Sequence, residues 1–337
     1  MKKIVSLVLV LLLVLGLAAC GKTDSKKPAS KPDAEITKLD VDCNVYVLQG
    51  PTGIGAAALW DKAEKGEGSL NYNFNMVAAN DEIVAKVVNG DADIAAVATN
   101  VASNLYNKTN GGVTVLAVNT LGVLNVVTKD ENIKSIADLR GKTVYLPGQG
   151  ANPEFISTYI LEQNGLKVGK DVKLEFVGDG SELVPKIVAD KKNEVVVIAP
   201  QPVATTITVQ APEAKIAINL NDEWDKCTDT KLVMGAVIVN NKFLKKNPDA
   251  VKLFLKDYAE SVNTVNTDTK KAGELCEKYG IVPKAAIATK AIPYCNIVCQ
   301  TGKELKKNLS AYLEFLFEKK AALVGNKLPA DEFYYAE

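Results

Sequence analysis

Histidine is absent from this chain of 337 residues. Imidazole is the usual general base near neutral pH and the commonest metal ligand, so its absence excludes Ser-His-Asp triads, histidine bases and imidazole metal sites. Arginine occurs once, at Arg140, and aromatic residues make up 6% of the sequence. We therefore expect neither a guanidinium clamp around a doubly charged ligand nor a cleft built on ring stacking.

An excess of charge of either sign is also missing. The chain has 40 basic and 40 acidic residues, which gives a formal net charge of 0 at pH 7. The basic residues form no stripe, so a nucleic-acid partner is not expected. After the N-terminal segment, no apolar stretch is long enough to cross a bilayer.

The N-terminal segment is the most specific part of the sequence. Two lysines precede an apolar run over residues 4–17, which is too short to span a bilayer comfortably and is typical of a secretory signal. At residues 17–21 (LAACG) the sequence resembles the bacterial lipobox, in which signal peptidase cuts before the cysteine and the thiol carries a diacylglyceryl group. We predict that residues 1–19 are a signal peptide and that the lipid on Cys20 anchors the protein to the cell membrane, facing outside the cytoplasm. An uncleaved N-terminal anchor is the alternative.

Residues 20–40 are rich in Lys, Ser, Pro and Asp and nearly free of large apolar side chains. Such a segment buries too little apolar surface to fold, so we predict a flexible tether behind the lipid anchor. The chain after the tether is long enough for two domains.

Cysteine usage leaves two interpretations open. With Cys20 lipidated, an odd number of thiols remains, at Cys43, Cys227, Cys276, Cys295 and Cys299. The spacing of Cys295 and Cys299 lacks the second pair that a zinc site needs, so we predict no metal. The remaining cysteines are either small buried residues or include a disulfide among Cys276, Cys295 and Cys299.

Short β-like runs alternate with helix-like runs from residue 43 onward. This alternation predicts an α/β fold with two tandem lobes, each built on a mainly parallel sheet with helices on both faces, joined by a hinge. The predicted strands are 43–50, 71–79, 92–99 and 113–120, then 139–148, 172–178, 194–200, 215–221 and 233–240.

Lobe boundaries follow from the restart of this pattern. We assign residues 41–122 and 236–337 to lobe 1 and residues 123–235 to lobe 2, with connections near 121–129 and 229–237. From Asn247 onward the period predicts helices, with Asn247 as the N-cap of a long helix that starts at Pro248.

Four motifs and their order resemble the type II periplasmic-binding-protein fold, in the group that binds nitrate, sulfonates, taurine or thiamine precursors. They are GPTG (50–53), NGDADIAAVATN (89–100), IKSIADLRGKTVYLPGQG (133–150) and VVVIAPQPVAT (195–205). The resemblance implies a monomeric substrate-binding lipoprotein that hands a small solute to the permease and ATPase of an ABC importer. It also implies a binding protein without a cofactor rather than an enzyme.

The predicted ligand site lies at the carboxyl ends of the strands, where open α/β sheets bind ligands. Loops there are small and polar, and most lead into helix N-termini with unpaired N–H groups. The nearest lysines, Lys129 and Lys142, belong to the opposite strand ends or lie beyond the hinge, so we expect a small neutral or monoanionic solute: a sulfonate, a carboxylate or a heterocycle. The candidate ligand-binding residues are Gly50, Pro51, Thr52, Gly53, Thr99, Asn100, Gly148, Gln149, Gly150, Gly180, Ser181, Gln201 and Pro202.

An enzymatic interpretation is the alternative. Residues 53–58 (GIGAAA) fit the dinucleotide pattern G-x-G-x-x-A. Pro51 and Thr52 stand where the tight turn of that motif should begin, and an exported lipoprotein would not meet a cytosolic nicotinamide cofactor. A surface-anchored enzyme or ligand sensor on the same two-lobe fold therefore remains the second hypothesis.

Overall fold

The computed structural model describes residues 37–336. The predicted signal peptide, the lipidation site Cys20 and most of the predicted tether lie outside the described residues. Within the described part, no helix is both long and apolar enough to cross a membrane.

The first sheet has six strands in the order β11-β4-β10-β3-β1-β2. Strand β1 runs parallel to β2 and β3, whereas β10 is antiparallel to β3 and β4, and β11 is antiparallel to β4. All eight residues of β4 are buried, as expected for a strand covered on both faces. The strands are β1 (Asp42–Leu48), β2 (Asn71–Val77), β3 (Ile94–Ala98), β4 (Val113–Thr120), β10 (Gly235–Asn240) and β11 (Ile297–Gln300).

The second sheet has five strands in the order β7-β6-β8-β5-β9. Strand β6 is parallel to β7 and β8, and β5 is antiparallel to β8 and β9. The strands are β5 (Leu124–Thr128), β6 (Thr143–Pro147), β7 (Lys173–Val177), β8 (Val196–Pro200) and β9 (Lys215–Asn219).

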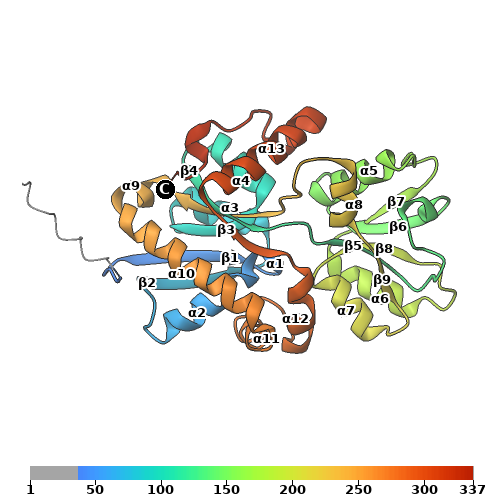
Figure 1. The fold of residues 1–337 in the computed structure, drawn as a ribbon, viewed down its shortest axis with the longest axis horizontal. Coiled ribbons are helices and arrows are strands. Elements are labelled where there is room, and N and C mark those ends of the chain that lie inside the picture. The colour runs from blue at the N-terminus through green and yellow to red at the C-terminus, as the bar shows by residue number, and fades with distance from the viewer. Residues whose placement is uncertain (1–36, 337) are drawn as a thin grey trace, which may run out of the picture. The chain divides into compact units, whose positions relative to one another are not determined.

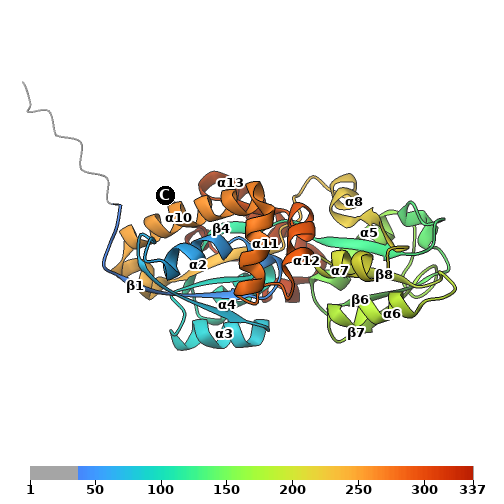
Figure 2. The ribbon, with the colours of Figure 1, turned by 90° about the horizontal axis from the view of Figure 1, so that it is seen from below.

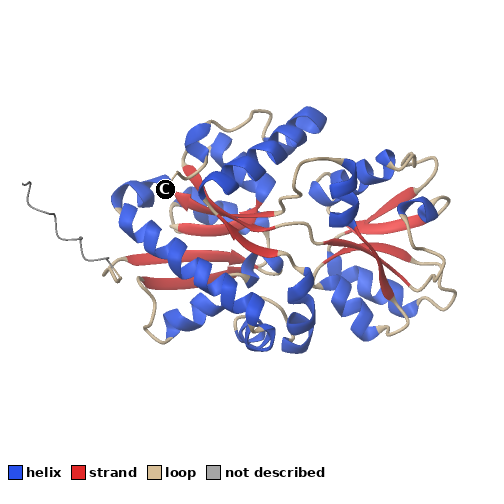
Figure 3. Ribbon diagram, viewed as in Figure 1, coloured by secondary structure: helices blue, strands red, loops and turns tan. Residues whose placement is uncertain are grey.

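Helices cover both faces of each sheet (Figures 1 and 3). One buried cluster joins a face of the first sheet to α2, α10, α11 and α12, and another joins its opposite face to α3, α4 and α13. The helices around the first sheet are α1 (Pro51–Ile54), α2 (Ala57–Glu64), α3 (Asn80–Asn89), α4 (Thr99–Lys108), α9 (Asn241–Lys246), α10 (Pro248–Thr267), α11 (Thr269–Lys278), α12 (Ala285–Ala291) and α13 (Gly302–Lys320). Those around the second sheet are α5 (Asn152–Gln163), α6 (Leu183–Ala189), α7 (Val203–Gln210) and α8 (Leu220–Cys227).

The predicted α/β fold with two sheet-based halves is confirmed. Most strands of each sheet run in one direction, but each sheet also contains antiparallel strands: β10 and β11 in the first sheet and β5 in the second. The reason lies in the two strands that follow a crossing between the sheets. After the carboxyl end of β4, the chain enters the second sheet beside the carboxyl end of β8, where Leu124 pairs with Pro200, so β5 must run backward. The chain returns to the first sheet beside the carboxyl end of β3, where Gly235 at the start of β10 pairs with Ala98, so β10 must also run backward.

Two further expectations need correction. Of the predicted connection 121–129, residues Leu124–Thr128 (LNVVT) form β5, and all of them are buried. The C-terminal region is not wholly helical, because Ile297–Gln300 forms edge strand β11 beside β4. Four residues are too few to show a strand period, and only pairing with β4 makes them a strand.

Helix ends follow the sequence signals more closely. Gly90 ends α3 in the left-handed region with φ 81°, a conformation that favours glycine. Helix α10 begins at Pro248 with Asn247 at the N-cap position, as predicted, although the Asn247 side chain makes no capping hydrogen bond.

Aromatic residues and cysteines lie mostly in the core. The Trp60 ring stacks on Tyr279, with ring centroids 4.4 Å apart. Trp224 in α8 contacts Phe315 of α13 at 5.0 Å, so the C-terminal helix touches the helices of the second sheet. The cysteines of the described residues form no disulfide with one another, and Cys43, Cys276 and Cys295 are buried. Burial raises the pKa of the Cys276 thiol to about 12, which makes that thiol unreactive.

Candidate functional site

A cavity of about 710 Å³ lies between the carboxyl ends of strands from both sheets. Its lining includes Leu48 at the end of β1, Ala98 at the end of β3 and Pro200 at the end of β8. This is where open α/β sheets bind ligands, and the volume is in the range of sites for small organic molecules.

The lining contains seven of the predicted site residues. On the first-sheet side, the Gly50 N–H donates to the Ile281 carbonyl at 3.0 Å, and Asn119 Nδ2 donates to the Thr52 carbonyl at 2.9 Å. Gly50 has a φ of 94°, which other residues rarely adopt, so the turn that leads into the cavity depends on glycine. The seven are Gly50, Pro51, Thr52, Gly180, Ser181, Gln201 and Pro202.

The other six predicted residues are not part of the lining, and their role in binding stays a prediction. Gly53 packs so closely against β1 that a Cβ there would overlap the Leu48 carbonyl oxygen. Thr99 is fully buried at the start of α4, and its Oγ1 has no hydrogen-bond partner among the described residues. The remaining four are Asn100, Gly148, Gln149 and Gly150.

Two loops that we expected to offer free backbone donors are instead held by carboxylates of the chain itself. Glu154 Oε2 accepts from the Gly150 N–H. Glu182 Oε1 accepts from the N–H groups of Gly178 and Asp179, at 2.9 and 3.2 Å. Because these donors already have anionic acceptors, a ligand can use them only by displacing the carboxylates.

Gln201 supplies a buried polar group on the second-sheet side. Its side chain is 1% exposed, and its Oε1 accepts from Thr205 Oγ1 at 2.7 Å. In the part of the chain that the structure describes, Gln201 Nε2 has no partner. An unpaired buried donor costs about 1–3 kcal/mol, so this amide is suited to a ligand acceptor that would remove the cost.

Most of the remaining lining was missed by sequence reasoning. Residues 281–284, together with Ala286 and Ile287, form an apolar wall before and within α12, and Lys284 is its one charged member. This wall is distant in sequence from the strand ends that line the cavity, and the Gly50 N–H donates to the Ile281 carbonyl at its start. No local motif marks such a contact.

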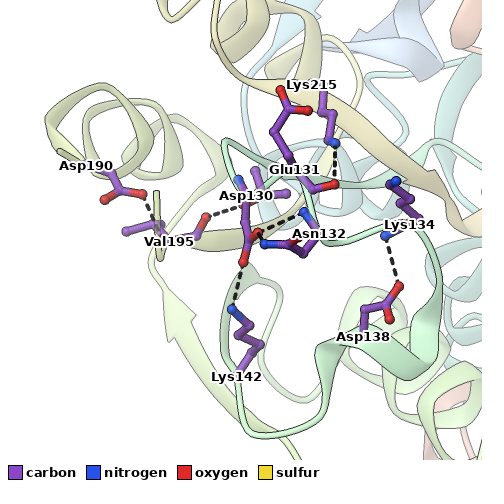
Figure 4. Close-up of polar contacts among 10 residues, drawn as sticks. Asp130, Glu131, Asn132, Lys134, Asp138, Lys142, Asp190, Val195 and Lys215 are labelled. Atoms are coloured by element: carbon purple, nitrogen blue, oxygen red, sulfur yellow. Dashed lines mark hydrogen bonds and ion pairs between the residues drawn. The ribbon is translucent and has the colours of Figure 1, made fainter. Parts of the chain in front are cut away.

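The charges near the cavity are few. Lys142 pairs with Asp130 at 2.8 Å in a polar cluster at the other end of the second sheet (Figure 4), and Lys129 pairs with Glu213 at 2.6 Å. Neither lysine lines the cavity, as predicted, but the expectation that no lysine lies nearby is wrong because Lys284 lines it.

The lining also lacks the usual parts of a catalytic or metal site. Its residues include no cysteine and no aromatic ring. Across residues 37–336, no group of three Cys, Asp or Glu side chains is placed to hold a metal ion. Asp179 is the one carboxylate in the lining, and hydrogen bonds from Ser181 hold its pKa below the usual range. An ionised carboxylate of this kind is a poor general base near neutral pH.

The sequence matches one family model and several curated proteins over part of its length. Residues 67–233 match the family described as ABC transporter, phosphonate, periplasmic substrate-binding protein. A protein of Brucella abortus (strain 2308), named as a binding protein, is 26% identical over 187 residues, which cover 56% of each chain. The chain thus spans about half the length of the curated relatives that it matches.

Solved structures share the fold over most of the chain. An ABC transporter protein from Parabacteroides distasonis has a TM-score of 0.73 at 23% identity, covering 88% of this chain and 100% of that one. The periplasmic aliphatic sulphonate binding protein SsuA from Escherichia coli has a TM-score of 0.68 at 14% identity, covering 87% and 92%. The alkanesulfonate-binding SsuA from Xanthomonas axonopodis pv. citri, bound to MOPS, has a TM-score of 0.65 at 10% identity, covering 89% and 100%.

Proposed function

We propose that this chain, whose residues 67–233 belong to the phosphonate-type periplasmic substrate-binding family of ABC transporters, captures a small organic solute in the cavity between its two sheets. A permease and its ATPase would then receive the solute and import it. The observation that carries this proposal is a cavity of about 710 Å³ at the strand ends, lined by both sheets and by two polar loops, 50–52 and 200–202.

The lining favours a solute with a small polar group and an apolar body. Thr52, Ser181 and Gln201 provide hydroxyl and amide groups, whereas most of the other side chains are aliphatic. We propose a neutral or monoanionic molecule such as a sulfonate, a carboxylate or a heterocycle. Two of the solved structures above are named as sulfonate-binding proteins, which supports the first of these classes.

Capture would involve closure of the two sheet-based halves about their connections. The chain crosses between the sheets at 121–123, before β5, and again at 228–234, before β10. Helices α7 and α12 contact each other beside the cavity, so movement about the connections would open or close this edge. The ligand would stabilise the closed form by contacting both sides at once.

We also propose that the protein works on the outer face of the cell membrane, held by a lipid on Cys20. A substrate-binding protein of a transporter needs to stay near its permease, and two acyl chains are enough for stable anchoring. The variant Cys20→Ser should leave the membrane fraction on cell fractionation. Retention of this variant in membranes would instead support an uncleaved anchor.

Binding itself can be tested with the full chain in detergent. A thermal-shift screen of alkylsulfonates, alkylphosphonates, small carboxylates and pyrimidines should reveal at least one class that raises the melting temperature. Thr52→Val keeps the side-chain volume but removes the hydroxyl from the cavity, so calorimetry should show affinity about five- to tenfold weaker. Thr208→Val is the control, because Thr208 lies in α7 outside the lining. No shift with any class would contradict the proposed function.

The matched family and the relatives named above are binding or transport proteins. They support the expectation that the chain is not an enzyme. We therefore retain solute capture as the proposed function.

A further inference from the structure

Only two residues in the cavity lining carry a charge, and their signs are opposite. Asp179 precedes α6 on the second-sheet side, and Lys284 precedes α12 on the first-sheet side. Every other lining residue is aliphatic, glycine, proline or a neutral polar side chain. The charge of a bound solute will therefore be met chiefly by these two groups.

The two charged groups differ in how far the protein already compensates them. Asp179 Oδ1 accepts from the Ser181 N–H at 2.6 Å, within a capping box completed by Glu182. By contrast, within residues 37–336 the Lys284 ammonium has neither a hydrogen-bond acceptor nor an ion-pair partner. The nearby acid Glu277 accepts from the Ala285 N–H instead.

The position of Lys284 makes its charge relevant to the cavity rather than to the outer surface alone. It lies in the segment that joins Ile281, the hydrogen-bond partner of Gly50, to α12. Helix α12 lies beside α7 in both ribbon views (Figures 1 and 2) and contacts it. Lys284 thus lies at the edge of the cavity where α12 of the first-sheet side contacts α7 of the second-sheet side.

We propose that Lys284 is the specificity-determining residue that makes the cavity select a singly charged anion. The anionic group of the solute lies at the edge beside α12, and the apolar body lies against the aliphatic wall of Ile281, Val282 and Ile287. Lys284 is exposed, so water solvates its ammonium before a solute binds. A solute that fills the cavity displaces part of this water, and the attraction between the ammonium and an anion then becomes stronger because the effective dielectric constant falls. This inference rests on the proposed function. It adds the sign of the ligand's charge and the residue that interacts with that charge.

A pair of probes that differ in charge but little in shape tests the inference. We would titrate the full chain with 1-butanesulfonate and with 1-butanesulfonamide, which is neutral at pH 7. The wild type should bind the sulfonate about tenfold more tightly, and Lys284→Gln should remove that preference while sulfonamide affinity changes less than twofold. Lys284→Glu should reverse the preference. Lys290→Gln is the matched control, because Lys290 lies in α12, the helix that Lys284 directly precedes, and carries the same charge but is outside the lining.

The outcomes separate this inference from the proposed function. If the wild type binds both probes equally, or if Lys284→Gln keeps the preference for the sulfonate, the inference is wrong and solute capture stands. If Lys290→Gln weakens sulfonate binding as much as Lys284→Gln does, the effect is one of net charge, and the inference is again wrong. If the wild type binds neither probe at millimolar concentration, both the inference and the proposed sulfonate class fail.

Discussion

On the first-sheet side of the cavity, Thr52 is held by Asn119 from β4, and Gly50 is held by Ile281 from beyond α11. On the second-sheet side, the turn at 178–181 is held by Glu182, the next residue along the chain. The wall on the first-sheet side, called the first wall, therefore depends on contacts between distant segments. The wall on the second-sheet side, called the second wall, depends on contacts within one turn. Long-range contacts of this kind form only when the whole sheet assembles, whereas a capping box can form locally.

The two walls also differ in which of their polar groups have no partner in the described part of the chain. In the second-sheet wall, the Glu182 carboxylate occupies backbone donors, whereas the amide nitrogen of Gln201 has no partner among the described residues. In the first-sheet wall, the Lys284 ammonium has no partner within residues 37–336. Gln201 is buried, so its unpaired amide gains directly from a ligand acceptor that offsets its desolvation. Lys284 is exposed, so its ammonium gains only when a bound solute displaces the water around it.

The largest effect is expected from breaking the long-range support of the first wall. Asn119 is 1% exposed, donates to the Thr52 carbonyl and the Tyr258 hydroxyl, and accepts from Thr120. Asn119→Ala leaves these buried groups unpaired, so the free energy of unfolding should fall by about 1–3 kcal/mol in urea titrations. Ligand affinity should fall as well, because the Thr52 turn loses its support. A loss of stability below about 0.5 kcal/mol, with unchanged binding, would show that Asn119 does not hold this wall.

A smaller effect is expected from the corresponding change in the second wall. Glu182→Gln keeps the shape of the capping box but removes the negative charge near Gly178 and Asp179, and Glu182 is exposed. We expect a loss of about 0.5 kcal/mol in the same urea titration. Affinity for 1-butanesulfonate should stay the same or rise, since a competing carboxylate is gone. If Glu182→Gln costs as much stability as Asn119→Ala, the contrast between the two walls does not hold.

Much of the fold could be predicted from local pattern. Strand β4 has the predicted bounds 113–120, because its mainly apolar run (VTVLAVNT) matches a strand buried on both faces. Helix α3 ends at the predicted Gly90, and α10 begins at the predicted Pro248. In each case a few neighbouring residues carry the whole signal, through periodicity, a glycine with positive φ or a proline in the first turn.

Strand direction and the short elements could not be predicted in this way. The antiparallel direction of β5 depends on the end at which the chain enters the second sheet, which the residues of β5 do not encode. Strand β11 exists because Ile297 pairs with Thr120 of β4. Both features are consequences of pairing between distant segments, so a period of two along the strand carries no information about them.

The sequence by itself determined the α/β alternation, the cavity loops at 50–52 and 200–202, and the absence of arginine and histidine from them. Only the tertiary structure decided how the loop at 50–52 is held, because its partners Asn119 and Ile281 lie far away in the sequence. It also brought Lys284 to the cavity from a segment with no motif. The physical reason is that residue type fixes the chemistry a side chain can offer, whereas only packing between distant segments decides which of these groups face the same space.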